Sequence, residues 1–387
     1  MVNFLLVIIY LSFISLGLPD GLLGSAWPTM GPELQVPVSY AGIISVVISV
    51  GTILSSLFSD RLTYHLGTGK VTAISVAMTA MALFGFSNSS TFWQLCLWSI
   101  PYGFGAGSVD ASLNNYVALH YASRHMSWLH CMWGVGAATG PYIMGFILTN
   151  GGRWPTGYSS VGTIQIVLAI ALFLSLPFWK ERKAQHQEGR EIQTPLKLTQ
   201  VIRIPGAGEA MLTFLCYCSL EQTAALWASS YLVLHKGVTE ERAAFFASMF
   251  YTGITIGRAL NGFLTIKCKD KQLIRMGHGV ILGGILVLFL PMGETMSLVG
   301  LLLIGLGCAP VFPCVIHSTP ELFGEEKSQA IIGVQMASAY VGCCVAPALF
   351  GVIANHVNVA LMPVYLLVIL VCMFGMYEKL LRVAKNR

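Results

Sequence analysis

The sequence predicts an all-α polytopic membrane protein, with twelve transmembrane helices arranged as two pseudo-repeated bundles of six. Three observations lead to this prediction. Hydrophobic residues make up 55% of the 387 residues and charged residues only 10%, with a mean hydropathy of +0.71, whereas a soluble domain carries about 25% charge. The apolar residues form twelve segments, each close to the roughly 20 residues that a spanning helix needs. The two halves of the chain also resemble each other.

The apolar segments follow one another with short connections, which gives the order of the expected elements. In the first half we expect spans at 3–28, 38–59, 70–89, 92–118, 126–149 and 158–179. In the second half we expect them at 206–234, 241–264, 273–291, 296–318, 328–351 and 358–379. One strongly polar stretch separates the sixth span from the seventh. We therefore expect an N-terminal bundle at 1–180, a cytoplasmic linker at 181–203 and a C-terminal bundle at 204–387.

The basic residues set the orientation of these spans. Of the 22 Lys and Arg residues, only Arg153, Lys236 and Arg242 fall in the predicted outer loops, and the rest fall on the opposite side. Cytoplasmic loops are enriched in Lys and Arg, so both termini are expected to be cytoplasmic. The net charge of +5 therefore indicates topology rather than nucleic-acid binding.

An internal repeat is visible as matching short motifs. The segments 51–61 and 253–263 align at an offset of 202 residues, 105–107 matches 305–307, and Asp20 falls opposite Glu221 or Gln222. Repeated halves around a site near the bilayer midplane are the architecture of alternating-access transporters. Gly-xxx-Gly pairs at 17/21, 103/107, 136/140 and 253/257 predict close helix packing. Pro310 and Pro313 are expected to break the tenth span, with a simple kink as the alternative.

The first span carries the most informative residue. Asp20 shares one helical face with Gly17, Gly21 and Gly24, and a carboxylate at the centre of a span costs about 2.5–3.5 kcal/mol on insertion scales. We therefore expect Asp20 to face a bundle interior or a water-filled cavity. Asp110 and Glu221 are the other acidic residues placed well within spans. Burial favours the neutral form of a carboxylate, so all three are candidates for proton coupling, and a structural hydrogen-bonding role is the alternative for each.

Amides, acids and aromatic rings beside these carboxylates suit a polar substrate such as a sugar. Amides and acids bind hydroxyls, and ring faces cover the apolar patches. His130 is either a proton acceptor for Asp110 or a packing histidine, and Trp227 reaches the site only if its span is broken. The candidate substrate-binding residues are Trp27, Asn114, His130, Trp133, Glu221, Gln222, Trp227 and Gln335. Arg61 and Arg258, at matching span ends, are candidate gating residues.

These motifs resemble the major facilitator superfamily over essentially the full length. The loop after the second span, with Asp60, Arg61 and the run 67–70, is a degenerate form of the superfamily's loop signature, and 257–262 is its echo in the second half. Asp20, the run 103–110 with Asn114, and the run 309–313 are most similar to the group of fucose permease and sodium-dependent glucose transporters. The resemblance implies two six-helix halves that rock around a central site.

The expected function is proton-coupled uptake of a monosaccharide or a related small polar carbohydrate. Sodium-coupled sugar uptake and efflux of amphipathic compounds by antiport are the alternatives, and a non-transporting receptor is disfavoured by the paired intramembrane carboxylates. No Ser/His/Asp set, zinc spacing or phosphate loop stands out, so we expect no enzyme activity, metal or cofactor. The expected setting is a monomer, integral to a bacterial cytoplasmic membrane.

Overall fold

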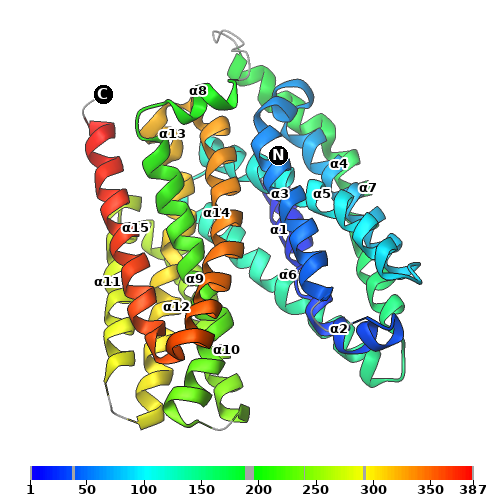
Figure 1. Cartoon of the computed structure of the whole chain (residues 1–387). Helices are drawn as coiled ribbons and strands as arrows, with labels where there is room; N and C mark the ends of the chain where they lie inside the picture. The colour runs from blue at the N-terminus through cyan, green and yellow to red at the C-terminus, as the bar shows by residue number, and fades with distance from the viewer. Residues whose placement is uncertain (1, 37–39, 188–195, 239, 291–292, 386–387) are drawn as a thin grey trace. The chain divides into compact units, whose positions relative to one another are not determined.

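The computed structural model of the chain describes residues 2–36, 40–187, 196–238, 240–290 and 293–385, and within these residues it is helical without strands (Figure 1). Its helices group into two compact units. Unit 1 comprises the described residues within 1–116 and 129–196, and unit 2 those within 117–128 and 197–387. Part of the predicted linker, 188–195, lies outside the described residues, and the predicted domain boundaries stay a prediction.

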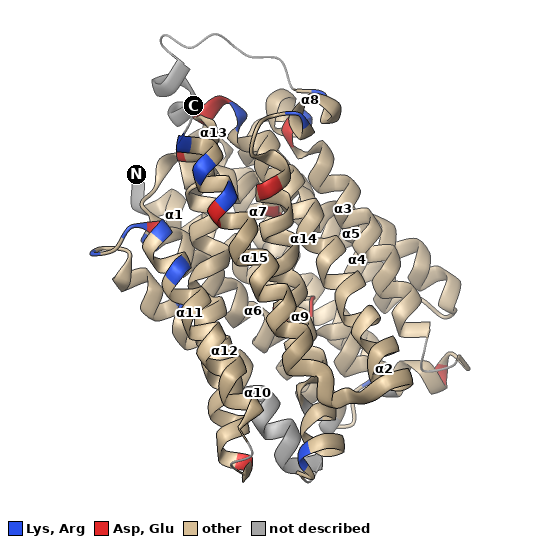
Figure 2. Cartoon of the chain, turned by 60° about the vertical axis from the view of Figure 1, so that its left-hand side comes forward, with Lys and Arg blue, Asp and Glu red and all other residues tan. Residues whose placement is uncertain are grey.

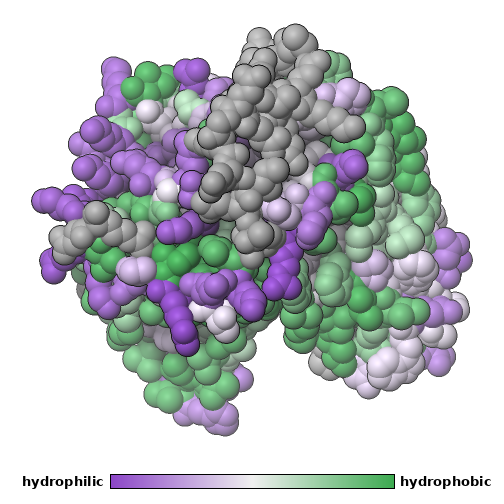
Figure 3. Space-filling model, turned by 90° about the horizontal axis from the view of Figure 1, so that it is seen from above, coloured by the Kyte–Doolittle hydropathy of each residue, from purple (hydrophilic) through white to green (hydrophobic). Residues whose placement is uncertain are grey.

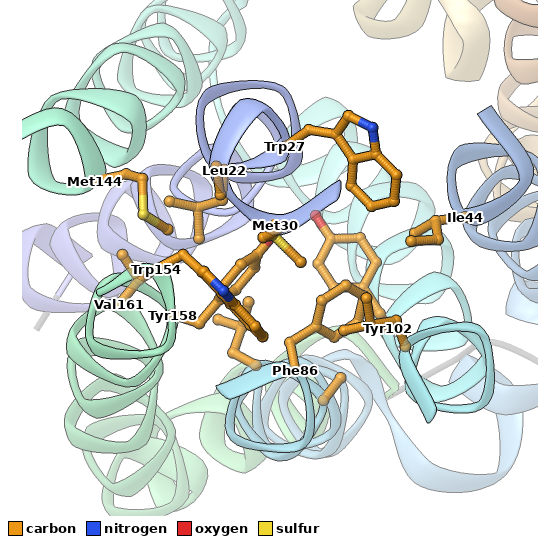
Figure 4. Packing of buried hydrophobic residues seen from close by; sticks show 14 of the residues in the cluster. Leu22, Trp27, Met30, Ile44, Phe86, Tyr102, Met144, Trp154, Tyr158 and Val161 are labelled. Carbon is orange, nitrogen blue, oxygen red and sulfur yellow. The ribbon is translucent and has the colours of Figure 1, made fainter. Parts of the chain in front are cut away.

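Unit 1 contains seven helices. They are α1 (Val2–Gly17), α2 (Leu22–Glu33), α3 (Tyr40–Leu66), α4 (Thr68–Ser87), α5 (Phe92–His120), α6 (Ser123–Thr149) and α7 (Trp154–Gln187), with the 117–128 ends of α5 and α6 assigned to unit 2. The helix α4 packs along α7, and α1 also packs against α7. A buried apolar cluster joins α2 to residues of α3–α7, with Trp27, Tyr102 and Trp154 among its largest side chains (Figure 4).

The first predicted span is broken into two helices. The helix α1 ends at Gly17, α2 begins at Leu22, and Asp20 lies in the turn between them. Pro19 has no N–H to donate, while the amides of Asp20 and Leu22 bond to the carbonyls of Gly17 and Pro19 at 3.1 Å. The carboxylate therefore stands at an interruption of the apolar segment rather than on a continuous helix.

Unit 2 is built from the second set of long helices. They are α9 (Ala207–Lys236), α10 (Glu240–Leu264), α11 (Asp270–Phe289), α12 (Gly293–His317), α14 (Glu325–Ile353) and α15 (Met362–Lys385), with the short helices α8 (Leu198–Ile202), α13 (Thr319–Phe323), η1 (Ala354–Asn358) and η2 (Val359–Leu361). The helix α12 packs against α10 and α11, and α9 packs against α14 and α15. Contrary to the expected break, α12 continues through Pro310 and Pro313.

Close glycine contacts show the internal repeat directly. In unit 1 a Cβ at Gly51 would meet Gly103, and in unit 2 a Cβ at Gly253 would meet Gly305. The same offset of 202 residues relates a second pair of contacts: Gly105 lies against the backbone of Ser75 and Thr79, and Gly307 against that of Gly277 and Ile281. The two units thus use equivalent helix crossings at equivalent positions.

The distribution of polarity fits a membrane protein. Eight stretches of the described residues are long and apolar enough to cross a membrane, and many large apolar side chains are exposed on the helices. The long helices outside these stretches, α5, α9 and α10, carry the buried polar residues Asp110, Glu221 and Arg258. In unit 2 the charged residues gather mainly at the end that carries α13 and the C-terminus (Figure 2).

Candidate functional site

Small residues on α1 and α6 let the two helices approach closely and so place Asp20. A Cβ added at Gly17 would overlap the Trp133 carbonyl oxygen, and one at Gly140 would overlap that of Leu18. Gly21 lies directly against the ring of Pro141. Helices that cross at such short range need glycine at the contact. The predicted packing role of these Gly-xxx-Gly pairs is confirmed, and the crossing brings α6 alongside the turn that contains Asp20.

Two aromatic donors hold the Asp20 carboxylate. The Tyr102 hydroxyl of α5 donates to Oδ1 at 3.3 Å, and the Trp133 indole Nε1 of α6 donates to Oδ2 at 2.9 Å. Asp20 itself is exposed in the structure, whereas Tyr102 is buried. Among the described residues, no Lys, Arg or His forms an ion pair with Asp20. The result is an accessible carboxylate in an aromatic setting, with no cation to compensate its charge.

A second polar group of unit 1 is fully enclosed. Asn114 Nδ2 donates to the Asp110 carboxylate at 2.8 Å, and the Asn114 carbonyl oxygen lies 3.0 Å from His130 Nε2. All three residues are buried, and the Phe13 ring packs edge-on against the His130 ring at a centroid distance of 5.3 Å. The amide of Asn114 therefore connects Asp110 on α5 to His130 on α6.

In unit 2 the predicted carboxylate is part of an ion pair. Glu221 of α9 lies 3.7 Å from the Arg258 guanidinium of α10, and the side chains are only 11% and 5% exposed. The gating role predicted for Arg258, through pairing with acids or helix C-termini, stays a prediction; the structure buries the guanidinium beside Glu221, more than a turn before α10 ends at Leu264. Glu221 therefore has a fixed countercharge, which Asp20 lacks.

The remaining aromatic and gating candidates differ in their surroundings. Trp27 belongs to the buried apolar cluster of unit 1, as Figure 4 shows. Trp227 stays off the Glu221 face because α9 is unbroken, and its indole Nε1 donates to the Pro347 carbonyl on α14 at 3.0 Å. Arg61 is exposed on α3.

The two glutamines of unit 2 differ in their surroundings. Gln335 is 1% exposed and accepts a hydrogen bond from the Thr319 hydroxyl at 3.1 Å. That contact ties α14 to α13 and gives Gln335 a structural partner. Gln222 is half-buried, so it keeps more access than Gln335.

Sequence reasoning missed Tyr102 and a polar cluster at one end of unit 2. Asp270, the first residue of α11, accepts hydrogen bonds from the Ser123 hydroxyl and, at 2.6 Å, from His317 Nδ1. His317 Nε2 lies 3.1 Å from the Tyr121 carbonyl oxygen, so both ring nitrogens face acceptors. Tyr102 directly precedes the glycine run at 103–107, which is the one signal that could have drawn attention to it.

A family comparison matches nearly the whole chain. The family model described as Major Facilitator Superfamily matches residues 9–377. Among curated proteins, the chain is 22% identical over 383 residues to bypass of stop codon protein 6 of Saccharomyces cerevisiae, covering 91% of this chain and 77% of that protein. It is 20% identical over 298 residues to the glucose/mannose transporter GlcP of Bacillus subtilis, covering 75% of this chain and 72% of that protein.

Solved structures show the same fold at low identity. The chain superposes on the transporter FucP in its outward conformation with a TM-score of 0.77 and 13% identity, covering 96% of this chain and 98% of that one. On the proton:xylose symporter XylE it superposes with a TM-score of 0.78 and 12% identity, covering 96% of this chain and 94% of that one. On the human organic anion transporter MFSD10 it superposes with a TM-score of 0.72 and 13% identity, covering 96% of this chain and 98% of that one. The names of XylE and MFSD10 describe different substrates, xylose and organic anions, so the likeness indicates the fold and not the transported substrate.

Proposed function

The chain belongs to the Major Facilitator Superfamily of membrane transporters, and we propose that it takes up a monosaccharide or a related small polar carbohydrate together with a proton. The observation that carries the proposal is the Asp20 carboxylate. It is accessible, lies at a break between α1 and α2, and is held by one phenol and one indole.

Proton coupling is assigned to Asp20 because its charge has no cationic partner among the described residues. An intramembrane carboxylate without a countercharge favours proton uptake, since the low dielectric of the membrane interior disfavours its ionised form. Glu221 is less suited to this role because Arg258 stabilises its charged form at 3.7 Å. Asp110 is enclosed with Asn114 and His130. That setting suits a role in relaying the proton or in stabilising the protonation state of the site. Sodium is the alternative ion, because carboxylate oxygens bind either.

A carbohydrate suits the chemistry around Asp20. Carboxylates accept hydrogen bonds from sugar hydroxyls, and the faces of Trp133 and Tyr102 offer apolar surface beside that acceptor. The names of GlcP and XylE, which describe a glucose/mannose transporter and a proton:xylose symporter, support the same substrate class. Transport would follow alternating access, with the matching helix crossings of the two units as the repeated elements.

A transport screen of the full chain in proteoliposomes tests this proposal. Vesicles loaded with one unlabelled monosaccharide at a time are diluted into the same labelled sugar, at two pH values and with or without sodium. We expect counterflow for at least one monosaccharide and net uptake driven by an inward proton gradient. Counterflow of amphipathic ions but of no sugar in the panel would contradict the substrate class, and uptake that needs sodium would contradict proton coupling.

A further inference from the structure

A pocket unrelated to Asp20 lies within unit 2, at the N-terminal end of α11. It has a volume of about 440 Å³ and is bordered by the turn at 265–269, α13 and the end of α15. Figure 3 looks onto the end of the molecule that carries α13, where hydrophilic residues cover much of unit 2 on the left of the view, with hydrophobic residues around its sides. The lining of the pocket itself combines polar and apolar side chains, among them Lys267, Lys269 and Ile266.

The charge of this pocket is positive. Lys267, Lys269 and Lys271 line it, all three are exposed, and none forms an ion pair with another described residue. The acidic residue between them, Asp270, already accepts hydrogen bonds from Ser123 and His317. Glu321 is the other acidic lining residue. Three ammonium groups thus face one carboxylate that is not otherwise engaged, which favours an anionic ligand.

A buried hydroxyl provides an independent sign of a ligand. Tyr377 lines the pocket, is 1% exposed, and its hydroxyl has no hydrogen-bond partner among the described residues. Buried polar groups are nearly always hydrogen-bonded, so a donor left over at a pocket wall indicates a partner that enters the pocket. The 20-residue helix α11 also begins here, and the N-terminus of a helix attracts phosphate and other anions.

The apolar part of the lining distinguishes a lipid from a free anion. Ile266, which is 62% exposed, and Leu381 line the same pocket as the lysines. Phe263 and Leu264, just before the turn, are also strongly exposed at the end of α10. A ligand with a phosphate group and hydrocarbon chains matches both features, and basic pockets at the cytoplasmic ends of transmembrane helices bind anionic headgroups. The positive-inside pattern places this turn on the cytoplasmic side.

We propose that this pocket binds the phosphate-bearing headgroup of an anionic phospholipid. Lys267, Lys269 and Lys271 supply the positive charge, Tyr377 donates its hydroxyl to a phosphate oxygen, and Ile266 and Leu381 contact the start of the acyl chains. The site does not include Asp20, so this proposal does not depend on which substrate the protein transports.

Binding of phosphatidylglycerol to the purified full chain tests the proposal. Native mass spectrometry in neutral detergent, with increasing phosphatidylglycerol, gives an apparent dissociation constant. The triple variant Lys267→Gln/Lys269→Gln/Lys271→Gln should bind at least about tenfold more weakly, since each basic group near an anionic lipid contributes several-fold. The matched control Lys70→Gln/Lys197→Gln/Lys327→Gln removes three exposed lysines elsewhere and should bind as the wild type does. Tyr377→Phe should weaken binding several-fold without lowering the temperature of unfolding.

Competition separates the lipid from a soluble phosphate. Inorganic phosphate and glycerol phosphate, added in large excess, should not displace phosphatidylglycerol, because they lack the acyl chains that contact Ile266 and Leu381. If these anions bind instead, with the same dependence on the three lysines, the lipid assignment is overturned. Equal weakening of binding in the control triple variant, or unchanged binding in the pocket variant, would contradict the assignment of this pocket as the binding site.

Discussion

The Glu221–Arg258 pair gives the sharpest energetic prediction. The variant Arg258→Met leaves the Glu221 carboxylate buried without its countercharge. At 3.7 Å, two unit charges attract by about 4 kcal/mol at an effective dielectric constant of roughly 20. Breaking a buried pair by removing one partner generally costs about 3–5 kcal/mol. We therefore expect Arg258→Met and Glu221→Gln each to lower the free energy of unfolding by about 3 kcal/mol or more.

The double variant makes this prediction specific. In Glu221→Gln/Arg258→Met neither charge remains buried, so the loss should be well below the sum of the two single losses. Replacement of a buried pair by uncharged residues is often close to neutral. Denaturant unfolding in mixed micelles, followed by tryptophan fluorescence, measures all four proteins of the cycle.

The same unit offers a matched control. Arg275 and Glu378 form a shorter pair, 2.7 Å apart, but their side chains are 50% and 21% exposed. The pair is bidentate, but exposed pairs contribute only about 0–1 kcal/mol, so their cycle should give a coupling energy near the upper end of that range, well below that of the buried pair. Equal coupling in the two cycles, or additive losses at Glu221 and Arg258, would refute the reasoning that burial and not distance sets the strength of the pair.

Three further predictions follow from other contacts. Gly140→Val should reduce the yield of folded protein strongly, because its side chain would overlap the Leu18 carbonyl, whereas the control Gly145→Val meets nothing within 4 Å; size-exclusion chromatography compares the two. Asn114→Leu leaves Asp110 and His130 without their amide link and should cost about 1–3 kcal/mol of stability, and a loss below 0.5 kcal/mol in denaturant unfolding would contradict this. Asp270→Asn should accelerate amide hydrogen exchange in 117–128 about tenfold or more, since hydrogen bonds to charged groups contribute about 1.5–3 kcal/mol, whereas Glu321→Gln should leave that exchange unchanged.

Hydropathy predicted the fold because the bilayer imposes it. Apolar length, the basic loops and the offset between the halves are properties of the linear sequence, and each long helix of the structure coincides with a predicted span. The packing role of the glycine pairs could also be predicted from the sequence, because glycines repeated at helical spacing mainly allow two helices to pack closely.

Contacts between helices were harder to predict. Arg258 was predicted as a gating residue from its place towards the end of a span, and only the packing of α9 beside α10 shows that it meets Glu221. The cluster of Ser123, Asp270 and His317 combines three segments far apart in the sequence. The break at Asp20 depends on a local choice between a kink and two helices, which the pattern of Gly17, Pro19 and Gly21 leaves open.

Sugar-driven proton movement tests whether Asp20 is the proton-coupling group. Wild-type protein and Asp20→Asn are reconstituted into weakly buffered vesicles, and the external pH is recorded when a sugar that shows counterflow is added outside. We expect the medium to become more alkaline with the wild type, because protons enter the vesicles together with the sugar. We expect no pH change with Asp20→Asn, which should still exchange labelled sugar. A pH change that persists in Asp20→Asn, or is absent from the wild type while sugar enters, would contradict the assignment of Asp20 as the proton-coupling group.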